Sequence, residues 1–282
     1  MSAKPISSKI RDVVFGILSF ILSMLFTVMS FGLVIESTLL NKNAWIDNMN
    51  RNDYFMDKTQ EIRKKLTDLT YATGLKEDFF DSVVDDTLVT EDTQKYIDGY
   101  FSGETTIIDS TNFKQKMLTS LDEYITENKI EKTDSKQIDK LVKEAEKIYK
   151  GNVSIMAIGS ASPYFLTLKK VLPFLLIGVG VLALGLIAVL FFANKWKHRA
   201  YKYIYYASAG SFLTNLALAM YMSLSGGAKN IVLESRSLYK FVVGFVNSVN
   251  VMFWICAGLF LLVSVALFFA YRSRFLKLTK NG

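Results

Sequence analysis

Two uncharged apolar segments, residues 13–35 and 171–193, lie on either side of a long polar stretch and constrain the fold more than any other feature. Each contains 23 residues. At ~1.5 Å per residue, a helix of that length crosses the ~30 Å hydrocarbon layer of a bilayer. Two further uncharged apolar stretches follow, at 203–225 and 241–271. The pattern predicts an all-α membrane protein with four transmembrane helices and a helical domain inserted between the first and second.

These spans divide the chain into one large domain and several short segments. Ser162 followed by Pro163 is typical of a helix start, so the second span is placed from that point. The stretch 241–271 is longer than a span needs, so its membrane part is expected to begin near Ser248. The predicted segments are an N-terminus at 1–12, spans at 13–36, 163–194, 203–225 and 248–271, a domain at 37–162, a link at 195–202, a short loop at 226–247 and a tail at 272–282.

The distribution of charge predicts the topology. Residues 1–12, residues 194–202 and the tail after Tyr271 together carry 11 basic side chains and one acidic side chain. The stretch 36–170 carries 24 acidic and 19 basic side chains. Cytoplasmic segments of membrane proteins are enriched in Lys and Arg. We therefore expect a plasma-membrane protein with both termini in the cytoplasm and the large domain outside, and no binding of nucleic acid.

The first span and the single cysteine bear on the cellular setting. The first span is too long for the apolar region of a cleaved signal peptide and no A-x-A-like site follows it, which favours an uncleaved signal anchor. Cys256 lies in the fourth span, so the outer domain is expected to have no disulfide, unlike those of tetraspanins and claudins. Lys outnumbers Arg 26 to 7, a composition that favours a low-GC bacterial origin.

Small and polar side chains recur at helical spacing on two of the spans. In a membrane, where lipid offers no hydrophobic drive for helices to associate, small residues allow close packing and polar residues form hydrogen bonds across helices. The prediction is packing between helices of one chain, with a homo-oligomer interface as the alternative. The residues concerned are Ser19, Ser23 and Thr27 on the first span, and Ala207, Ser211, Asn215 and Ala219 on the third.

The outer domain has the periodicity of about five amphipathic helices. Gly74 and Gly103 are expected to end two of them as C′ glycines. Thr90 is the expected N-cap of the helix that ends at Gly103. No stretch alternates in the way that a strand requires. The expected helices cover about 52–73, 76–86, 91–102 and 111–128, with a last one that runs from a cap at Asp134 or Ser135 to Lys150.

The inventory of reactive residues favours a protein that is not an enzyme. His198 is the one histidine and lies on a predicted link among lysines. We therefore expect neither a Ser-His-Asp triad nor a His/Cys metal site. No glycine-rich phosphate loop occurs and no cofactor is expected. No charged residue lies in the core of any span, which disfavours an ion-coupled transporter. An acidic cluster offers a weak candidate site for Ca²⁺, with Asp85, Asp86, Glu91 and Asp92 as ligands.

Part of the outer domain resembles a family. In order, the stretch 54–101 contains an amphipathic helix, a break at Gly74-Leu75, a paired Phe79-Phe80 in an acidic helix, and Thr90-Glu91-Asp92 ahead of Tyr96-Ile97. This order resembles the outer loop of uncharacterised four-pass membrane proteins of low-GC Gram-positive bacteria. The resemblance implies placement in a bacterial envelope and brings no activity or catalytic residue.

The leading functional hypothesis is a non-enzymatic membrane interaction protein: a sensor, an accessory subunit or a scaffold of an envelope complex. Its expected partners are the lipid bilayer and either itself or other membrane proteins. The alternative is an oligomeric pore or transport component. The environment of Asn215 separates the two, because Asn215→Leu would abolish flux through a pore but would disrupt assembly if the side chain serves packing.

Overall fold

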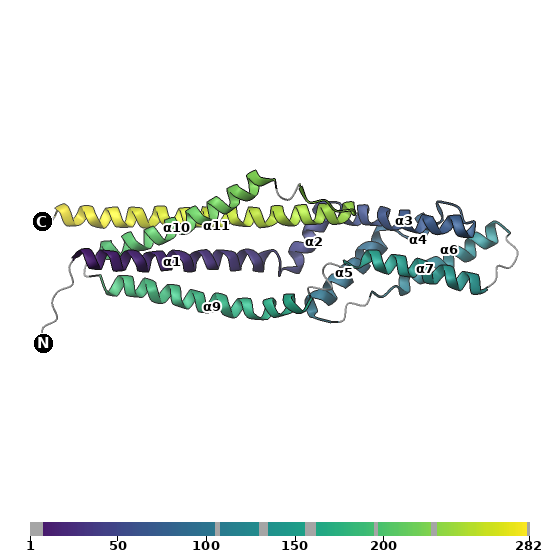
Figure 1. Cartoon of the computed structure of the whole chain (residues 1–282), viewed down its shortest axis with the longest axis horizontal. Helices are drawn as coiled ribbons and strands as arrows, with labels where there is room; N and C mark the ends of the chain where they lie inside the picture. The colour runs from purple at the N-terminus through teal and green to yellow at the C-terminus, as the bar shows by residue number, and fades with distance from the viewer. Residues whose placement is uncertain are drawn as a thin grey trace. The chain divides into compact units, whose positions relative to one another are not determined.

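A computed structural model describes residues 8–104, 108–129, 135–155, 162–194, 197–226 and 230–280, and their regular structure is helical throughout (Figure 1). The all-α prediction is confirmed. The chain forms two compact units. Unit 1 comprises residues 1–40, 169–230 and 246–282, and unit 2 comprises residues 41–168 and 231–245.

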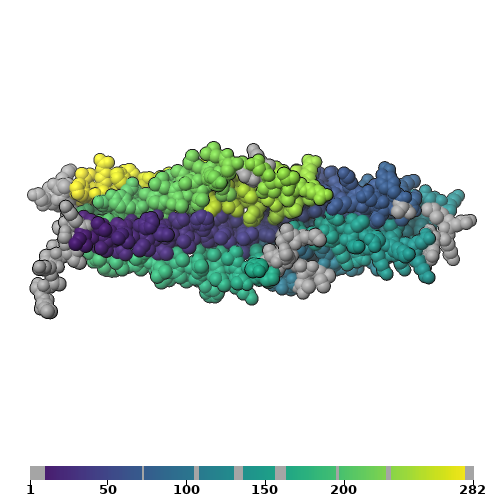
Figure 2. Space-filling view, viewed as in Figure 1, coloured from purple at the N-terminus to yellow at the C-terminus, as the bar shows by residue number. Residues whose placement is uncertain are grey.

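Unit 1 is built from four long helices. They are α1 (Ser8–Ser37), α10 (Lys197–Ser225), and the greater part of both α9 (Ser162–Phe192) and α11 (Arg236–Lys280). Helix α1 lies against α10, and in the space-filling view it runs between later helices of the unit (Figure 2). Helix α9 begins at the Ser162-Pro163 pair, as the sequence predicts.

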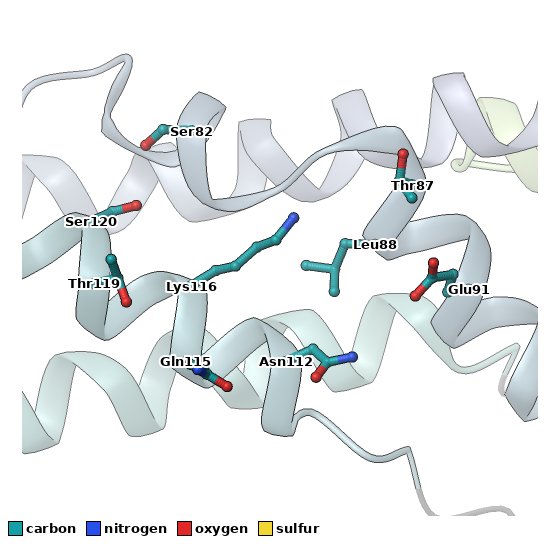
Figure 3. A pocket seen from close by; sticks show the side chains of 9 residues that line it. All are labelled: Ser82, Thr87, Leu88, Glu91, Asn112, Gln115, Lys116, Thr119 and Ser120. Atoms are coloured by element: carbon teal, nitrogen blue, oxygen red, sulfur yellow. The ribbon is translucent and has the colours of Figure 1, made fainter.

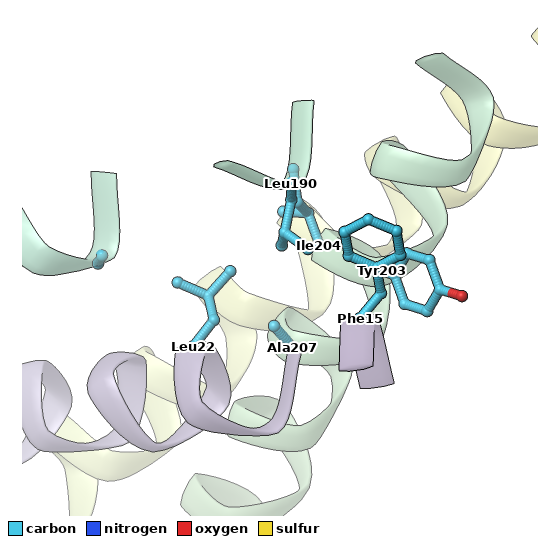
Figure 4. Close-up of a cluster of buried hydrophobic side chains, with 7 residues drawn as sticks. Phe15, Leu22, Leu190, Tyr203, Ile204 and Ala207 are labelled. Atoms are coloured by element: carbon cyan, nitrogen blue, oxygen red, sulfur yellow. The ribbon is translucent and has the colours of Figure 1, made fainter. Parts of the chain in front are cut away.

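An apolar cluster from α1, α9 and α10 fills one part of unit 1. Phe15 and Leu22 of α1 point toward Leu190 of α9 and toward Ile204 and Ala207 of α10 (Figure 4). The ring of Tyr203 lies 5.4 Å from that of Phe15, measured between centroids. The residues of the cluster are Phe15, Leu22, Ala183, Leu190, Tyr203, Ile204 and Ala207.

Three of the described helices are long and apolar enough to cross a membrane: Ile10–Ser37, Pro163–Phe192 and Arg236–Leu276. Helix α10 is not among them, because Ser208, Ser211 and Asn215 lower its mean hydropathy. These three side chains are fully buried within unit 1. The apolar side chains of α10 include exposed ones, such as Leu213, Met220 and Leu224. The low hydropathy of α10 therefore comes in part from a face that packs inside the unit.

The described residues of unit 2 include six short helices together with the first residues of α9 and α11. Gly74 and Gly103 end two of the helices in the left-handed conformation, with φ of 73° and 81°, as predicted for C′ glycines. The helices are α2 (Lys42–Arg51), α3 (Tyr54–Thr73), α4 (Phe79–Val83), α5 (Asp86–Ser102), α6 (Thr111–Glu127) and α7 (Ser135–Val153).

The structure differs from the prediction at two helices of unit 2, α2 and α5. Helix α2 was not predicted, and its start is capped by the Asn41 side chain, which accepts hydrogen bonds from Asn43 N and Ala44 N. Helix α5 begins at Asp86, one turn before the predicted start, because Asp85 rather than Thr90 is its N-cap.

Parts of the predicted loop at 226–247 and tail at 272–282 are helical, since α11 runs from Arg236 to Lys280. In the same way residues 197–202 of the predicted link are helical and belong to α10. The expected cap at Asp134 lies outside the described residues.

Candidate functional site

Trp45 is the centre of an aromatic cluster inside unit 2, here called the Trp45 cluster. Its indole is 5% exposed and lies 5.2 Å from the ring of Phe101 and 5.6 Å from that of Phe241, between centroids. Phe165 of α9 lies 4.5 Å from Tyr100 of α5. The cluster brings together rings from α2, α5, α9 and α11, so it holds the starts of two apolar helices in the core of unit 2. Its members are Trp45, Tyr100, Phe101, Phe165, Phe241 and Phe245.

The carboxylate of Glu61 caps the start of α11. Its Oε1 accepts from the Ser237 amide at 2.9 Å, and its Oε2 accepts from the Ser237 hydroxyl at 3.0 Å and from the Ser235 hydroxyl at 2.9 Å. The Ser235 hydroxyl in turn accepts from the Leu238 amide at 3.2 Å. A carboxylate at a helix N-terminus satisfies amides that have no partner within the helix and interacts favourably with the helix dipole. Glu61 therefore ties α3 to the first turn of α11.

This arrangement makes the stability of unit 2 dependent on pH through Glu61. Burial acts to raise the pKa of Glu61, but the Ser237 amide, Lys58 and the two serine hydroxyls outweigh it, so the pKa is lowered. A lowered folded-state pKa contributes stability that is present above the unfolded value of about 4.3 and is lost as the pH falls through the folded value.

We expect Glu61→Gln to lose less stability than the unmodified chain on acidification below about pH 4, where the carboxylate of the unfolded chain is already protonated. Unfolding in denaturant at a series of pH values measures the effect. The difference between the two curves isolates Glu61 from the other carboxylates. Curves that run parallel through this range would show that the contact with α11 does not favour the charged form.

An ion pair reinforces the same contact. The Asp57 carboxyl of α3 is 4% exposed, and its Oδ2 lies 2.6 Å from Lys240 Nζ of α11. Arg236 Nε is 3.5 Å from the same oxygen. Both cations lie in the first two turns of α11, so the start of this helix carries positive side chains that face a buried carboxylate. Removing one partner of such a buried pair destabilises the fold, because the other charge remains desolvated.

Gly244 allows α2 and α11 to approach closely. A Cβ at this position would lie 2.1 Å from Asn48 Oδ1 and 2.4 Å from Asn52 Nδ2. Asn48 Nδ2 donates to the carbonyl of Phe241 at 2.8 Å, and Asn52 Nδ2 donates to Asn48 Oδ1 at 2.7 Å. Any side chain at 244 would displace the amides that make these hydrogen bonds.

Gly244→Ala is expected to destabilise unit 2 by about 1–3 kcal/mol, because the added methyl forces both asparagine side chains to move. Gly151→Ala is the matched control in the same unit. Position 151 is helical and a Cβ there meets no atom within 4 Å. It should be neutral or should stabilise by up to about 1 kcal/mol, since Ala has the higher helix propensity. Thermal unfolding of both variants in mild detergent measures the difference, and equal midpoints would contradict the close approach.

A polar cleft of about 550 Å³ lies between α4, α5 and α6 of unit 2 (Figure 3). Its lining is dominated by hydroxyl, amide and charged side chains. Lys116 extends across it toward α5 and forms an ion pair with Asp85 at the start of that helix. Such a lining offers hydrogen-bond donors and acceptors to the polar surface of a binding partner. The lining residues are Ser82, Thr87, Leu88, Glu91, Asn112, Gln115, Lys116, Thr119 and Ser120.

The four carboxylates of the calcium candidate have separate environments. Asp85 Oδ1 accepts from the Leu88 amide at 2.7 Å, and Asp86 is the first residue of α5. Glu91 lines the polar cleft. Asp92 is 2% exposed and accepts from the Tyr149 hydroxyl at 2.7 Å, and burial raises its pKa against the effect of that hydrogen bond. Within the described residues, no three acidic, His or Cys side chains form a group that could hold a metal ion.

In unit 1 the predicted packing residues of α1 and α10 face each other. Ser19 Oγ donates to the Tyr203 carbonyl at 2.7 Å. Ser211 Oγ donates to the Ser23 carbonyl at 2.8 Å, and Thr27 Oγ1 donates to Ser211 Oγ at 3.5 Å. These bonds lie within one chain and join α1 to α10.

Asn215 continues this line of hydrogen bonds and is fully buried. Its Nδ2 donates to Ser30 Oγ at 3.1 Å and to the Ser211 carbonyl at 2.8 Å. Ala207 and Ala219 are also fully buried. Ala207 belongs to the apolar cluster of α1, α9 and α10, and Ala219 packs with Val34 of α1 and Phe253 of α11.

The basic segments of unit 1 meet at one end of it. Arg199 at the start of α10 lies 3.8 Å from Asp12 at the start of α1. The guanidinium of Arg274, near the end of α11, lies 5.0 Å from the ring centroid of Tyr201. The ring of His198, which lies on the predicted link, is 6.0 Å from that of Phe275, between centroids. The start of α1, the start of α10 and the end of α11 are therefore neighbours (Figure 1).

Comparisons of the chain with known protein families, with curated proteins and with solved structures find no match. The site therefore has to be interpreted from its own geometry.

The sequence analysis missed the contacts that hold the start of α11. Phe241 and Phe245 have the i,i+4 spacing of one helical face, and Ser235 precedes them at a position suited to an N-cap. These signals predict a helix start near 236. No sequence signal connects this start with Glu61 or Trp45, which lie in distant parts of the chain.

Proposed function

We propose that the chain is a four-span protein of a bacterial plasma membrane that binds a partner through unit 2, and that it serves as a sensor, accessory subunit or scaffold rather than as an enzyme. The termini are placed in the cytoplasm and unit 2 outside. The meeting of the basic segments at one end of unit 1 supports this topology, because a single cytoplasmic face would then hold all of them.

The proposal of a fourth span is supported by α10. The hydroxyls of its buried polar face and the Asn215 Nδ2 form hydrogen bonds, several of them to α1 and α11, while Leu213 and Leu224 are exposed at 60% and 80%. In a bilayer, a helix whose polar groups bond to neighbouring helices can present an apolar face to lipid. Helix α10 fits that description.

The observation that carries the functional proposal is the Trp45 cluster. Through it, the first residues of α9 and α11 are core residues of unit 2, and the same two helices continue as apolar segments long enough to cross a membrane. A partner that altered the packing of α2 and α5 would act directly on the starts of two spans. A domain that served only as a tethered module would not need this construction.

The test is purification of the tagged chain from its host membrane in mild detergent, with mass determination and identification of co-eluting proteins. We expect a partner at fixed stoichiometry that is lost from Thr119→Arg, which places a bulky cation in the polar cleft. Thr126→Arg is the matched control, since Thr126 is an exposed residue of α6 outside the cleft. Retention of the partner by both variants would remove the cleft from the binding surface.

Two further outcomes would overturn the proposal. A homo-oligomer without a partner that conducts ions in liposomes would establish the oligomeric pore instead. Ser120→Cys that stays unlabelled by an impermeant maleimide on cells with a permeable wall would place unit 2 in the cytoplasm.

A further inference from the structure

An apolar groove lies between α10 and α11 in unit 1. Its volume is about 390 Å³, within the ~300–1,000 Å³ of small-molecule sites. Leu213 and Val265 on its walls are 60% and 44% exposed. The groove residues of α10 span nine positions, about 12 Å at the helical rise, which is less than half of the ~30 Å hydrocarbon layer. The lining residues are Tyr205, Ala209, Phe212, Leu213, Leu261, Ser264, Val265 and Phe268.

The buried hydroxyl of the groove lining is already satisfied. Ser264 is 4% exposed, and its hydroxyl donates to Ser208 Oγ at 3.0 Å. Ser208 Oγ donates in turn to the Phe260 carbonyl at 3.1 Å. Apart from Ser264 and the Tyr205 hydroxyl, the lining side chains are apolar, so the groove suits an apolar occupant such as a hydrocarbon chain.

Two basic residues follow the groove-lining positions of α10 and α11 in helical register. Lys202 is three positions before Tyr205 on α10, and Arg272 is four positions after Phe268 on α11. The Lys202 ammonium lies over the rings of Tyr203 and Tyr206, at 5.8 Å and 5.6 Å from their centroids, so it has to turn from these rings to reach a headgroup at the groove. The rings of Tyr205 and Phe268 lie 5.8 Å apart. Within the described part of the chain, neither Lys202 nor Arg272 has a carboxylate at ion-pair distance, whereas Arg199 of α10 pairs with Asp12.

We propose that this groove binds one acyl chain of an anionic phospholipid, whose phosphate is bound by Lys202 and Arg272. Basic pockets beside transmembrane helices on the cytoplasmic side are suited to anionic headgroups. Arg binds phosphate through two donors in a fixed geometry, and Lys adds a point charge. The occupant is a lipid of the cytoplasmic leaflet, so this inference rests on the topology given under the proposed function.

The test compares phosphatidylglycerol with phosphatidylcholine, each added to the full chain purified in mild detergent. Native mass spectrometry counts the lipid retained per chain, and thermal unfolding measures stabilisation. We expect one phosphatidylglycerol to be retained per chain and to raise Tm by several degrees, with no comparable effect of phosphatidylcholine. The Lys202→Gln/Arg272→Gln variant should lose this preference.

Two more variants separate the headgroup contact from the groove. Lys140→Gln/Lys143→Gln removes the same charge from exposed positions of α7 and should keep the preference. Ala209→Phe fills the groove and should reduce retention of phosphatidylglycerol while both cations remain; circular dichroism verifies that each variant is folded.

The proposal is overturned if both lipids are retained equally and the Lys202→Gln/Arg272→Gln variant retains as much of each as the unmodified chain. The bound lipid would then be non-specific annular lipid. Failure of the topology is detected separately, because Ser120→Cys labelling does not depend on bound lipid.

Discussion

Trp45→Ala is expected to destabilise unit 2 by about 3–5 kcal/mol, the largest effect of any single truncation proposed here. The indole is 5% exposed and lies within 6.4 Å of five other rings, between centroids. Its removal deletes the largest side chain of the cluster and leaves a cavity between four helices. Thermal unfolding in mild detergent, followed by far-ultraviolet circular dichroism, should have a Tm lower by on the order of 10 °C.

The matched control is Tyr164→Ala. Tyr164 precedes Phe165 on α9 and is 81% exposed, so its truncation should change stability by less than about 0.5 kcal/mol. Trp45→Phe should fall between the two, because a smaller ring still fills part of the site. A Trp45→Ala variant as stable as Tyr164→Ala would show that the cluster does not form the core of unit 2.

The same variant has a local consequence that hydrogen exchange can detect. Because Trp45 packs on Phe165 and Phe241, its loss should release residues 162–168 of α9 and 236–245 of α11 more than the distant end of α7. This pattern would connect the stability of unit 2 with the starts of two spans, which is the property on which the proposed function depends.

Much of the fold is predictable because the relevant signals are local. The helix at 54–73 follows from periodic apolar residues and from Gly74, which adopts the positive φ that only glycine adopts readily. The stripes on α1 and α10 are also local patterns, since steps of three and four place residues on one helical face.

What escaped prediction depends on tertiary contacts. Helix α2 is polar, with mostly Lys, Asn, Asp and Arg around Trp45, and it forms because that one indole is buried among rings from other helices. The start of α11 at Arg236 was not predicted. Its first turns contain Arg236 and Lys240, whose charges are typical of a solvent-exposed loop, and in the fold these turns contact Asp57 and Glu61 of α3.

The acidic cluster shows that residues close together in the sequence can have different environments in the fold. Asp85 and Asp92 are seven residues apart on a helix, and the sequence alone places them together on one acidic segment. In the fold Asp85 caps α5 and pairs with Lys116, while Asp92 turns inward to Tyr149. A charge count cannot separate a capping carboxylate from a buried one, because the difference arises from helix start and orientation.

Lys240→Met is expected to destabilise unit 2 by about 3 kcal/mol, the second large effect. The variant leaves the Asp57 carboxylate, which is 4% exposed, without its 2.6 Å partner. Removing one member of a buried pair costs about 3–5 kcal/mol because the other charge remains desolvated. The low end of that range applies, since the Lys240 side chain is 25% exposed and Arg236 stays 3.5 Å from Asp57.

The double variant Asp57→Asn/Lys240→Met tests the physical reason. If desolvation of an unpaired carboxylate causes the loss, removing that charge as well should recover at least about 1 kcal/mol, and the cycle should show coupling between the two positions. Lys42→Met is the matched control: Lys42 pairs with Asp98 at 2.9 Å, but the two side chains are 42% and 54% exposed. Such exposed pairs contribute less than about 1 kcal/mol.

Denaturant unfolding in mild detergent measures Lys240→Met, Asp57→Asn, their double variant and Lys42→Met against the unmodified chain. Equal losses for Lys240→Met and Lys42→Met would mean that water reaches Asp57 as freely as it reaches Asp98, and α11 would then not be held by a buried charge. A large loss for Lys240→Met alone, partly recovered in the double variant, would mean that the first turns of α11 are fixed to α3 by a desolvated ion pair. In that case release of the start of α11 from unit 2 would leave Asp57 without its closest cationic partner.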